Sequence, residues 1–279
     1  MQTKDICSLL GITPQTIRLY EKHSAEFHYE TDDKGWRLFP FGSLAQMFAL
    51  RGLTKYGMTV KGATSLVLGA SFSDLEKSYA SCKDDYAVER RRLDLLESCI
   101  DDDLRYIEEA RRLVDAFDVV ESPSFWWVDY EEGNRSAEAI ARRKWISEQW
   151  TAELPFIFFS PLGIGPQFSL DSEWKIGFGL EEKYVEPLGI RDPERYGMSF
   201  SSRRCLATTL RIQNPAPDYD ILSKYVNYYR YHAILPLLKH AEKRGLKVVG
   251  SLMSRLIAVS VKDSDGIAFD YYLAWLPIE

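Results

Sequence analysis

One stretch of this chain constrains its fold more than any other, because residues 72–117 contain neither glycine nor proline. Within it, apolar side chains recur every seven residues, at Tyr79, Tyr86, Leu93, Ile100, Ile107 and Val114, and a second set follows three residues later, at Cys82, Leu96, Ala110 and Phe117. A heptad repeat sustained this long predicts one long helix with a narrow apolar seam. We expect a second copy of the chain to cover the seam, giving a homodimer; a long helix packed on its own domain is the alternative.

The long helix divides the chain into three parts. The composition changes again after Ser122, where Pro123 marks a boundary, and 279 residues are enough for two or three small domains. We predict three parts, with boundaries at residues 1–71, 72–120 and 121–279, of which the middle one is a dimerising coiled-coil helix.

The N-terminal part reads as a helix-turn-helix. Residues 3–10 predict a short helix that Gly11 ends, and the stretch "TPQTIRLYEK" predicts a second helix with Thr13 as its N-cap and Pro14 in its first turn. This second helix turns Ile17 inward and leaves Gln15, Thr16 and Arg18 outward. A helix, a glycine-containing turn and a second helix are typical of DNA-binding domains.

A β-hairpin is predicted next, in "HYETDDKGWRLFPF", around the turn-forming residues 32–35. A helix, a break at Gly57 and a second short helix from Thr59 complete this part of the chain. The N-terminal part therefore predicts a helix-turn-helix with a β-hairpin wing.

Charge is spread unevenly along the chain. The whole carries −6, whereas residues 1–70 hold eight Lys/Arg and six Asp/Glu, a net of +2. The net charge excludes a protein that coats nucleic acid with a generally basic surface. A mildly basic N-terminal part joined to an acidic remainder instead fits a protein that contacts phosphate only through its N-terminal part.

The C-terminal part predicts an α+β fold in which the order strand–helix–strand–strand occurs twice. The first copy is residues 125–132, 134–154, 156–162 and 173–181, and the second is 205–213, 217–245, 247–263 and 266–278, with a kink or break in its helix at Pro236. We expect the two halves to form one antiparallel sheet with helices on one side.

The N-terminal motifs resemble those of the MerR family of bacterial transcription activators. The matching residues are Thr13, Thr16, Ile17, Arg18, Tyr20 and Glu21, followed by Gly35, Trp36 and Arg37 in the wing. The resemblance implies a dimer that places two recognition helices in successive major grooves of a pseudo-palindromic promoter, and a ligand that changes the DNA so that RNA polymerase can use it. The chain departs from the family at Leu19, where a second aromatic is usual, and in the acidic stretch "HSAEFHYE".

The resemblance and the chemistry of the side chains together predict the contacts to double-stranded promoter DNA. They are Thr13, Thr16, Arg18, Tyr20, Trp36 and Arg37. The two arginines can grip phosphates with forked hydrogen bonds, and the threonines lie where a helix N-terminus favours anions. For Tyr20 and Trp36, the alternative role is to pack the wing against the rest of the N-terminal part.

The C-terminal part resembles the GyrI-like effector-binding domain, through its duplicated element order and the closing "YLAWLPI". The combination is that of the multidrug-sensing branch, which implies a small organic, aromatic effector. We predict ligand contacts from Trp127, Tyr130, Phe178, Tyr228, Met253, Arg255, Tyr271 and Trp275. The alternative for each aromatic is a place in the core.

Arg255 is the most informative departure from this second resemblance. In the multidrug sensors a buried glutamate of the penultimate strand attracts cationic drugs, and Arg255 (or Ser254) stands there in this chain. A buried arginine would disfavour cations and favour anionic or carbonyl-rich ligands. The alternative is a structural salt bridge, for example with Asp270, and the acidic residues Asp129, Glu131 and Glu181 leave a cation site open.

Other classes of function are weakly supported. The four cysteines, Cys7, Cys82, Cys99 and Cys205, lack CxxC spacing, which predicts reduced thiols and disfavours a metal or redox sensor. We find no catalytic motif, and His232 and His240 stand too far apart to share a metal. We therefore expect no enzyme, cofactor or metal, although a small-molecule hydrolase and a protein-interaction module remain alternatives. Without a long apolar run or leader, we expect a bacterial cytoplasmic protein without a membrane partner.

Overall fold

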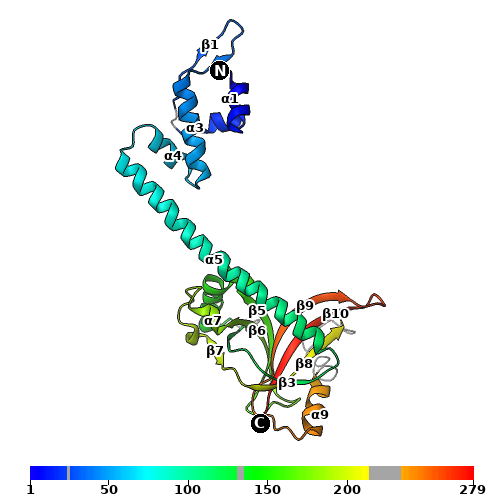
Figure 1. Ribbon diagram of the computed structural model, residues 1–279. Coiled ribbons are helices and arrows are strands. Elements are labelled where there is room, and N and C mark those ends of the chain that lie inside the picture. Colours follow the sequence, from blue (N-terminus) through cyan, green and yellow to red (C-terminus); the bar gives the residue numbers. More distant parts are fainter. Residues whose placement is uncertain (24–25, 131–134, 214–233) are drawn as a thin grey trace. The chain divides into compact units, whose positions relative to one another are not determined.

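The computed structural model describes residues 1–23, 26–130, 135–213 and 234–279 (Figure 1). It contains two compact units, Met1–Leu93 and Asp94–Glu279, which are described separately. The predicted three-part division at residues 71 and 120 stays a prediction. Within the described residues, none of the helices has the length and apolar character to cross a bilayer.

The first unit begins with the predicted helix-turn-helix. Helix α1 (Thr3–Leu10) ends at Gly11, whose φ of 59° is the left-handed conformation of a helix C-cap. Helix α2 (Pro14–Lys22) starts as expected, because the Thr13 hydroxyl accepts a hydrogen bond from the Thr16 amide at 3.2 Å. Ile17 is buried, which confirms its inward orientation.

The wing and two further helices follow. Strands β1 (Glu30–Thr31) and β2 (Arg37–Leu38) pair antiparallel, and the Asp32 carboxylate closes their turn by accepting from the amides of Lys34 and Trp36. Helix α3 (Phe41–Lys55) and helix α4 (Val60–Val67) then flank Gly57, which has a φ of 87°. The prediction of a wing, a helix, a break and a second helix is confirmed.

The long helix α5 (Phe72–Arg112) is confirmed, although it ends before Val114, which instead bridges to Thr209. It carries two stripes. The heptad stripe is exposed in the single chain: Tyr79, Tyr86, Leu93, Ile100 and Ile107. A second stripe is buried within the C-terminal unit: Cys99, Asp102, Tyr106 and Ala110. Because neighbouring helix positions lie about 100° apart, one face can pack on the chain's own domain while the other stays open.

The second unit contains two four-stranded antiparallel sheets. One has the order β3 (Asp118–Glu121), β8 (Arg204–Gln213), β10 (Ala268–Pro277) and β9 (Met253–Lys262). The other has the order β5 (Ile157–Ile164), β6 (Glu173–Glu181), β4 (Phe125–Asp129) and β7 (Gly197–Phe200). In both, the first strand of the repeat pairs with the last, so the duplicated order is confirmed, while β3 and β7 were not predicted.

The expectation of one continuous sheet is wrong. Edge strands β5 and β9 meet through one isolated bridge, in which Gly163 and Leu252 exchange backbone hydrogen bonds of 3.0 and 2.9 Å. Beside it, Pro161 has no N–H to donate, and its carbonyl accepts from the Ser254 hydroxyl at 2.6 Å instead of from a strand amide. Proline thus interrupts the ladder between the two halves.

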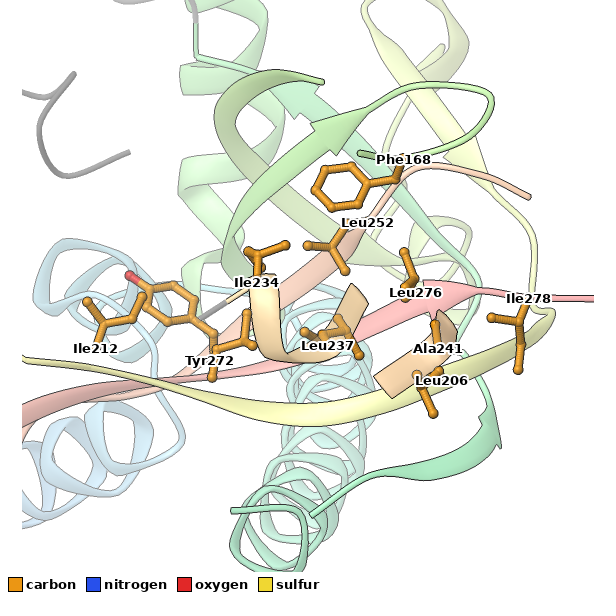
Figure 2. Packing of buried hydrophobic residues seen from close by; sticks show 12 residues of the cluster. Phe168, Leu206, Ile212, Ile234, Leu237, Ala241, Leu252, Tyr272, Leu276 and Ile278 are labelled. Atoms are coloured by element: carbon orange, nitrogen blue, oxygen red, sulfur yellow. The ribbon is translucent and has the colours of Figure 1, made fainter. Parts of the chain in front are cut away.

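Helices cover both faces of these sheets, so the expectation of helices on one side is also wrong. Strand β10 shows why, since its side chains alternate between two cores. Tyr272 and Leu276 pack with Leu237 and Ala241 of α9 (Leu235–Lys243), as Figure 2 shows, whereas Trp275 packs on the other face with Tyr106 of α5.

The remaining helical segments follow β4 and β6. The predicted helix at 134–154 is α6 (Ala137–Trp145), which continues through the π-helical η1 (Ile146–Trp150) and the 3-10 helix η2 (Thr151–Phe156). Two short segments, α7 (Glu182–Val185) and η3 (Pro193–Arg195), lie between β6 and β7. In the second repeat, residues 217–233 of the predicted helix lie outside the described residues, and Pro236 occupies the first turn of α9.

Two glycines of β6 allow large rings to lie flat on this strand. A Cβ on Gly179 would come within 2.2 Å of the Phe158 ring, and a Cβ on Gly177 within 2.2 Å of the Val128 carbonyl oxygen and 2.5 Å of the Trp127 ring. The rings occupy the volume that side chains on β6 would need, so the alternating glycines of "KIGFGLE" serve packing.

We predict that Gly179→Ala lowers the free energy of unfolding of the C-terminal unit by about 1–3 kcal/mol, because the added methyl overlaps the Phe158 ring. Urea denaturation followed by tryptophan fluorescence checks this. The signal reports mainly on the C-terminal unit, since Trp36 alone among the seven tryptophans lies in the first unit. The control is Gly52→Ala on α3, where a Cβ meets nothing within 4 Å. Equal stability of wild type and Gly179→Ala would contradict the packing role.

Candidate DNA-binding and effector sites

The wing is tied to α2 by Arg37. Its Nη1 donates to Glu21 Oε1 at 2.9 Å, and its guanidinium lies 4.4 Å from the centre of the Tyr29 ring. The ion pair is partly exposed, so its contribution to stability is small. Its effect is to hold a cation of β2 beside the end of α2. Arg18 of α2 and Trp36 of the wing are exposed as well.

The predicted DNA contacts are not equally accessible. Trp36 is 60% exposed and its ring is open to a ligand, so packing does not explain its place. Tyr20 is 1% exposed and belongs to the core with Ile6 and Ile17. The prediction of Tyr20 as a DNA contact is therefore wrong, because a ring without accessible surface cannot lie along a sugar-phosphate edge.

Thr13 and Thr16 form a capping box at the start of α2. Their hydroxyls lie 3.1 Å apart, and each also bonds a backbone amide of the other residue. Both side chains reach the surface, Thr13 more than Thr16. Their hydroxyls thus shape the helix start first, and contact with DNA stays a prediction for both.

A buried ion-pair cluster lies at the centre of the C-terminal unit. Arg255 of β9 donates from Nη1 to Glu181 Oε1 at 3.1 Å and from Nη2 to Asp103 Oδ1 at 2.5 Å. Its guanidinium lies 4.4 Å from the centre of the Tyr106 ring and 4.5 Å from that of Phe158. The cluster joins α5 and strands of both sheets through a single side chain.

Asp102, one position before Asp103, forms a second group of ionic contacts. Its carboxylate pairs with Lys183, accepts from the Tyr184 hydroxyl at 2.5 Å and accepts from Arg105 Nη2 at 3.0 Å. Burial opposes ionisation of Asp102, but these hydrogen bonds outweigh it and hold the pKa of Asp102 below its usual value. Asp102 is therefore charged at neutral pH.

Two cavities adjoin the cluster and share Tyr106. One, of about 370 Å³, is lined by Asp103, Tyr106, Phe158, Arg255 and neighbouring residues of β5 and β9. The other, of about 300 Å³, is lined by Arg105, Tyr106, Glu109, Glu181, Lys183, Trp275 and the segment 121–124. Burial raises the pKa of Glu109 at the second cavity, and burial also keeps Tyr106 protonated by raising its pKa. The first cavity combines aromatic and aliphatic walls with a few polar groups, as ligand sites do, whereas the second is lined mainly by charged and polar side chains around Tyr106 and Trp275.

The predicted ligand residues do not form one site. Arg255 and Trp275 line the two cavities, while Trp127 and Met253 lie in the core beneath them, fully buried. The ring centres of Tyr130 and Phe178 are 6.0 Å apart. Both rings lie on the face of β4 and β6 opposite to Trp127, since Phe178 pairs in register with Val128 rather than with Trp127. Tyr271 is half-buried on β10, and Tyr228 lies outside the described residues.

The partners of Arg255 differ from the predicted one. Asp270 accepts from the Ser260 amide at 2.8 Å, and the ion pairs of Arg255 go to Glu181 and Asp103. The argument that Arg255 favours an anion does not hold, because two carboxylates already neutralise its charge. Sequence reasoning did not single out Asp103, Tyr106 and Phe158 as site residues. The spacing Cys99, Asp102, Tyr106, Ala110 is a helical stripe that could have indicated Tyr106 of α5, whereas this signal says nothing of Phe158 on β5.

All four cysteines are free, as predicted. Burial raises the pKa of Cys99 to about 11 and that of Cys205 to about 12, which leaves both as unreactive thiols at neutral pH. Across the described residues, no group of three or more His, Cys, Asp or Glu side chains is arranged to hold a metal ion.

The first unit belongs to the class of winged helix-turn-helix domains, given α1, α2 and the hairpin that Arg37 ties to α2. Residues 1–69 match the family described as "MerR HTH family regulatory protein". This part of the chain is therefore a MerR-family helix-turn-helix domain. No curated protein matches the chain.

Three solved structures illustrate the wider likeness. EcmrR in its complex with DNA has 13% identity and a TM-score of 0.32, covering 100% of this chain and 99% of that chain. The EcmrR C-terminal domain has 12% identity and a TM-score of 0.33, covering 58% and 96%. A hydrolase from Listeria innocua has 11% identity and a TM-score of 0.31, covering 58% and 91%. These TM-scores are too low to support an argument about function.

We predict that Asp102→Asn destabilises the C-terminal unit by about 1–3 kcal/mol at pH 7, because Lys183 and Arg105 lose their charged acceptor. Since the folded pKa of Asp102 is depressed, its contribution is present above the unfolded pKa of about 4 and is lost as pH falls through the lower folded value.

Urea denaturation between pH 7 and pH 3 checks this prediction. The difference between wild type and Asp102→Asn should shrink below about pH 4. Asp101→Asn, which alters an exposed neighbour on the same helix, is the matched control and should change little. A difference that stays constant down to pH 3 would show that the charge of Asp102 is not what matters.

Proposed function

We propose that this chain is a ligand-responsive transcription regulator that binds a pseudo-palindromic promoter as a homodimer. The observation that carries the proposal is the MerR-family helix-turn-helix domain at residues 1–69, with Arg18, Trp36 and Arg37 exposed on α2 and the wing. Arginines at such positions hold phosphates and orient the helix on the duplex. A protein of this kind acts on DNA in the bacterial cytoplasm and reaches RNA polymerase indirectly, through the promoter.

The exposed heptad stripe of α5 supports the homodimer. Tyr79, Tyr86 and Leu93, together with Tyr56 of the α3 C-terminus, line a groove of about 630 Å³ in the first unit. Further along, Ile100 and Ile107 remain exposed in the single chain. Apolar side chains at heptad spacing are the surface that a second helix covers in a coiled coil.

The C-terminal unit would be a GyrI-like effector domain that takes a small organic ligand without chemical turnover. Its duplicated strand order and the two cavities at the Arg255 cluster support this role. Asp102 and Asp103 are adjacent on α5 and pair with cations on the sheet side. A ligand that enters either cavity would alter these ion pairs, and α5 would carry the change toward the DNA-binding domain.

We predict that Arg18→Ala weakens binding to a duplex selected by the wild-type protein by about tenfold or more, because phosphate contacts are lost in both protomers. The slope of log affinity against log salt should fall by about two for the dimer. Fluorescence anisotropy over a salt series measures both.

Arg91→Ala is the matched control for Arg18→Ala, since Arg91 is an exposed arginine of α5 away from the helix-turn-helix. It should retain the wild-type affinity and slope. Unchanged binding by Arg18→Ala would sink the assignment of α2, and a wild-type protein that selects no DNA would sink the proposed function.

We predict that Ile100→Glu weakens the homodimer by more than about tenfold, because a charge placed in a coiled-coil seam loses its hydration. Ile100 is 59% exposed in the single chain, so the substitution should leave the folded protomer intact. Analytical ultracentrifugation measures the association. Glu108→Gln, on an exposed position beside the stripe, is the control, and a dimer of unchanged strength in Ile100→Glu would place the interface elsewhere.

A further inference from the structure

Arg255 is bound as proteins bind free organic cations. Its guanidinium lies against the faces of two aromatic rings, Tyr106 and Phe158, and donates to two carboxylates, Glu181 and Asp103. Aromatic faces and charge-assisted hydrogen bonds are the two devices by which such cations are recognised. These four residues are called the cage below.

The cage is built into the fold rather than formed at its surface. Tyr106, Phe158 and Glu181 are buried, and Asp103 is the member that reaches solvent. They come from α5, β5 and β6, and Gly179 lets the Phe158 ring lie flat where it contacts Arg255. A site assembled from three elements keeps its shape without its occupant better than a surface contact does.

The charges around the cage determine which ligands it excludes while Arg255 is in place. An arginine stays protonated in proteins, so the cage always holds one positive charge while Arg255 is in place. Lys183 lies 3.6 Å from Glu181 Oε2, and the Arg105 guanidinium lies 4.4 Å from the centre of the Tyr106 ring, so two more positive charges adjoin the cage. A further cation would meet these charges, and an anion would meet the two carboxylates.

Space for a ligand exists beside the cage. The two cavities of about 370 and 300 Å³ share Tyr106, and its buried Oη makes no hydrogen bond of good geometry among the described residues, since Arg105 beside it lies over the ring. A buried hydroxyl without a partner costs free energy, which a ligand atom in either cavity could recover. The cavity next to Arg255 therefore offers room for a molecule and one unmet polar contact.

From this geometry we propose that Arg255 is an internal ligand, which fills a site for planar amidinium or guanidinium cations and thereby excludes such cations from the effector domain. The inference rests on the proposed function, since it names the residue that sets the charge specificity of the effector site. Removing the guanidinium should leave a preformed cage in which Asp103 has lost its ion pair and Glu181 keeps only the longer contact to Lys183, so that a free planar cation can then occupy it.

The test compares the full-length wild type with Arg255→Ala by isothermal titration calorimetry. The probe is benzamidinium, whose planar fork of N–H groups matches the guanidinium and whose ring fits the aromatic walls. Benzamide and benzoate, of nearly the same shape but neutral and anionic, are the matched ligands. We expect Arg255→Ala to bind benzamidinium at least tenfold more tightly than wild type does, with no such gain for benzamide or benzoate.

Two further variants sharpen the result. Arg255→Lys keeps a cation on the strand and should bind benzamidinium no better than wild type. Glu181→Gln added to Arg255→Ala removes one carboxylate and should reverse most of the gain. Equal benzamidinium affinity in wild type and Arg255→Ala, or a gain of the same size for benzamide, would overturn the proposal.

Loss of folding also gives an answer. If Arg255→Ala does not fold, Arg255→Gln, which keeps most of the side-chain volume, is titrated in the same way. If neither variant folds alone, both are refolded in the presence of benzamidinium. Recovery of a folded, thermally stable protein supports the proposal that Arg255 is an internal ligand, and failure to recover such a protein contradicts it. Because calorimetry needs no DNA, a failure here is distinct from a wild-type protein that binds no promoter, which would contradict the proposed function itself.

Discussion

The arrangement of the C-terminal unit depends on one side chain that three elements share. Arg255 leaves β9 of one sheet, pairs with Glu181 of β6 in the other and reaches Asp103 on α5. A buried charge is costly unless it is fully paired, so these partners can hardly move apart independently. Asp102 adds a second link, because it binds Lys183 and Tyr184 just after β6.

Local signals predicted most of the fold. The caps at Thr13 and Gly11, the hairpin turn and the heptads each rest on a few neighbouring residues, and each is found in the structure. The error concerned how distant strands meet. A sequence does not reveal that β5 and β9 share one bridge, since that depends on Pro161 lying opposite Ser254 in space.

The site was predicted less well, for a related reason. Aromatic side chains mark both cores and ligand sites, and strand alternation alone cannot say which face becomes a cavity. Trp127 therefore lies under the site and Tyr130 on the other face of the sheet. The interpretation of α5 as a single heptad stripe also missed Asp103 and Tyr106, because the inward-packing positions Cys99 and Tyr106 directly precede the exposed heptad positions Ile100 and Ile107.

The interrupted ladder between the two sheets has a mechanical meaning. Elsewhere in the unit, a change in the angle between neighbouring strands would break a row of backbone hydrogen bonds. Between β5 and β9 it would strain one bridge, the side-chain hydrogen bonds of Ser254 and Ser251, and the Arg255–Glu181 ion pair. The two sheets of the C-terminal unit are thus joined mainly by side chains rather than by a backbone ladder, with Arg255 as the central connection. Helix α5 contacts both sheets, so a small rotation of one sheet against the other would act on a helix 41 residues long.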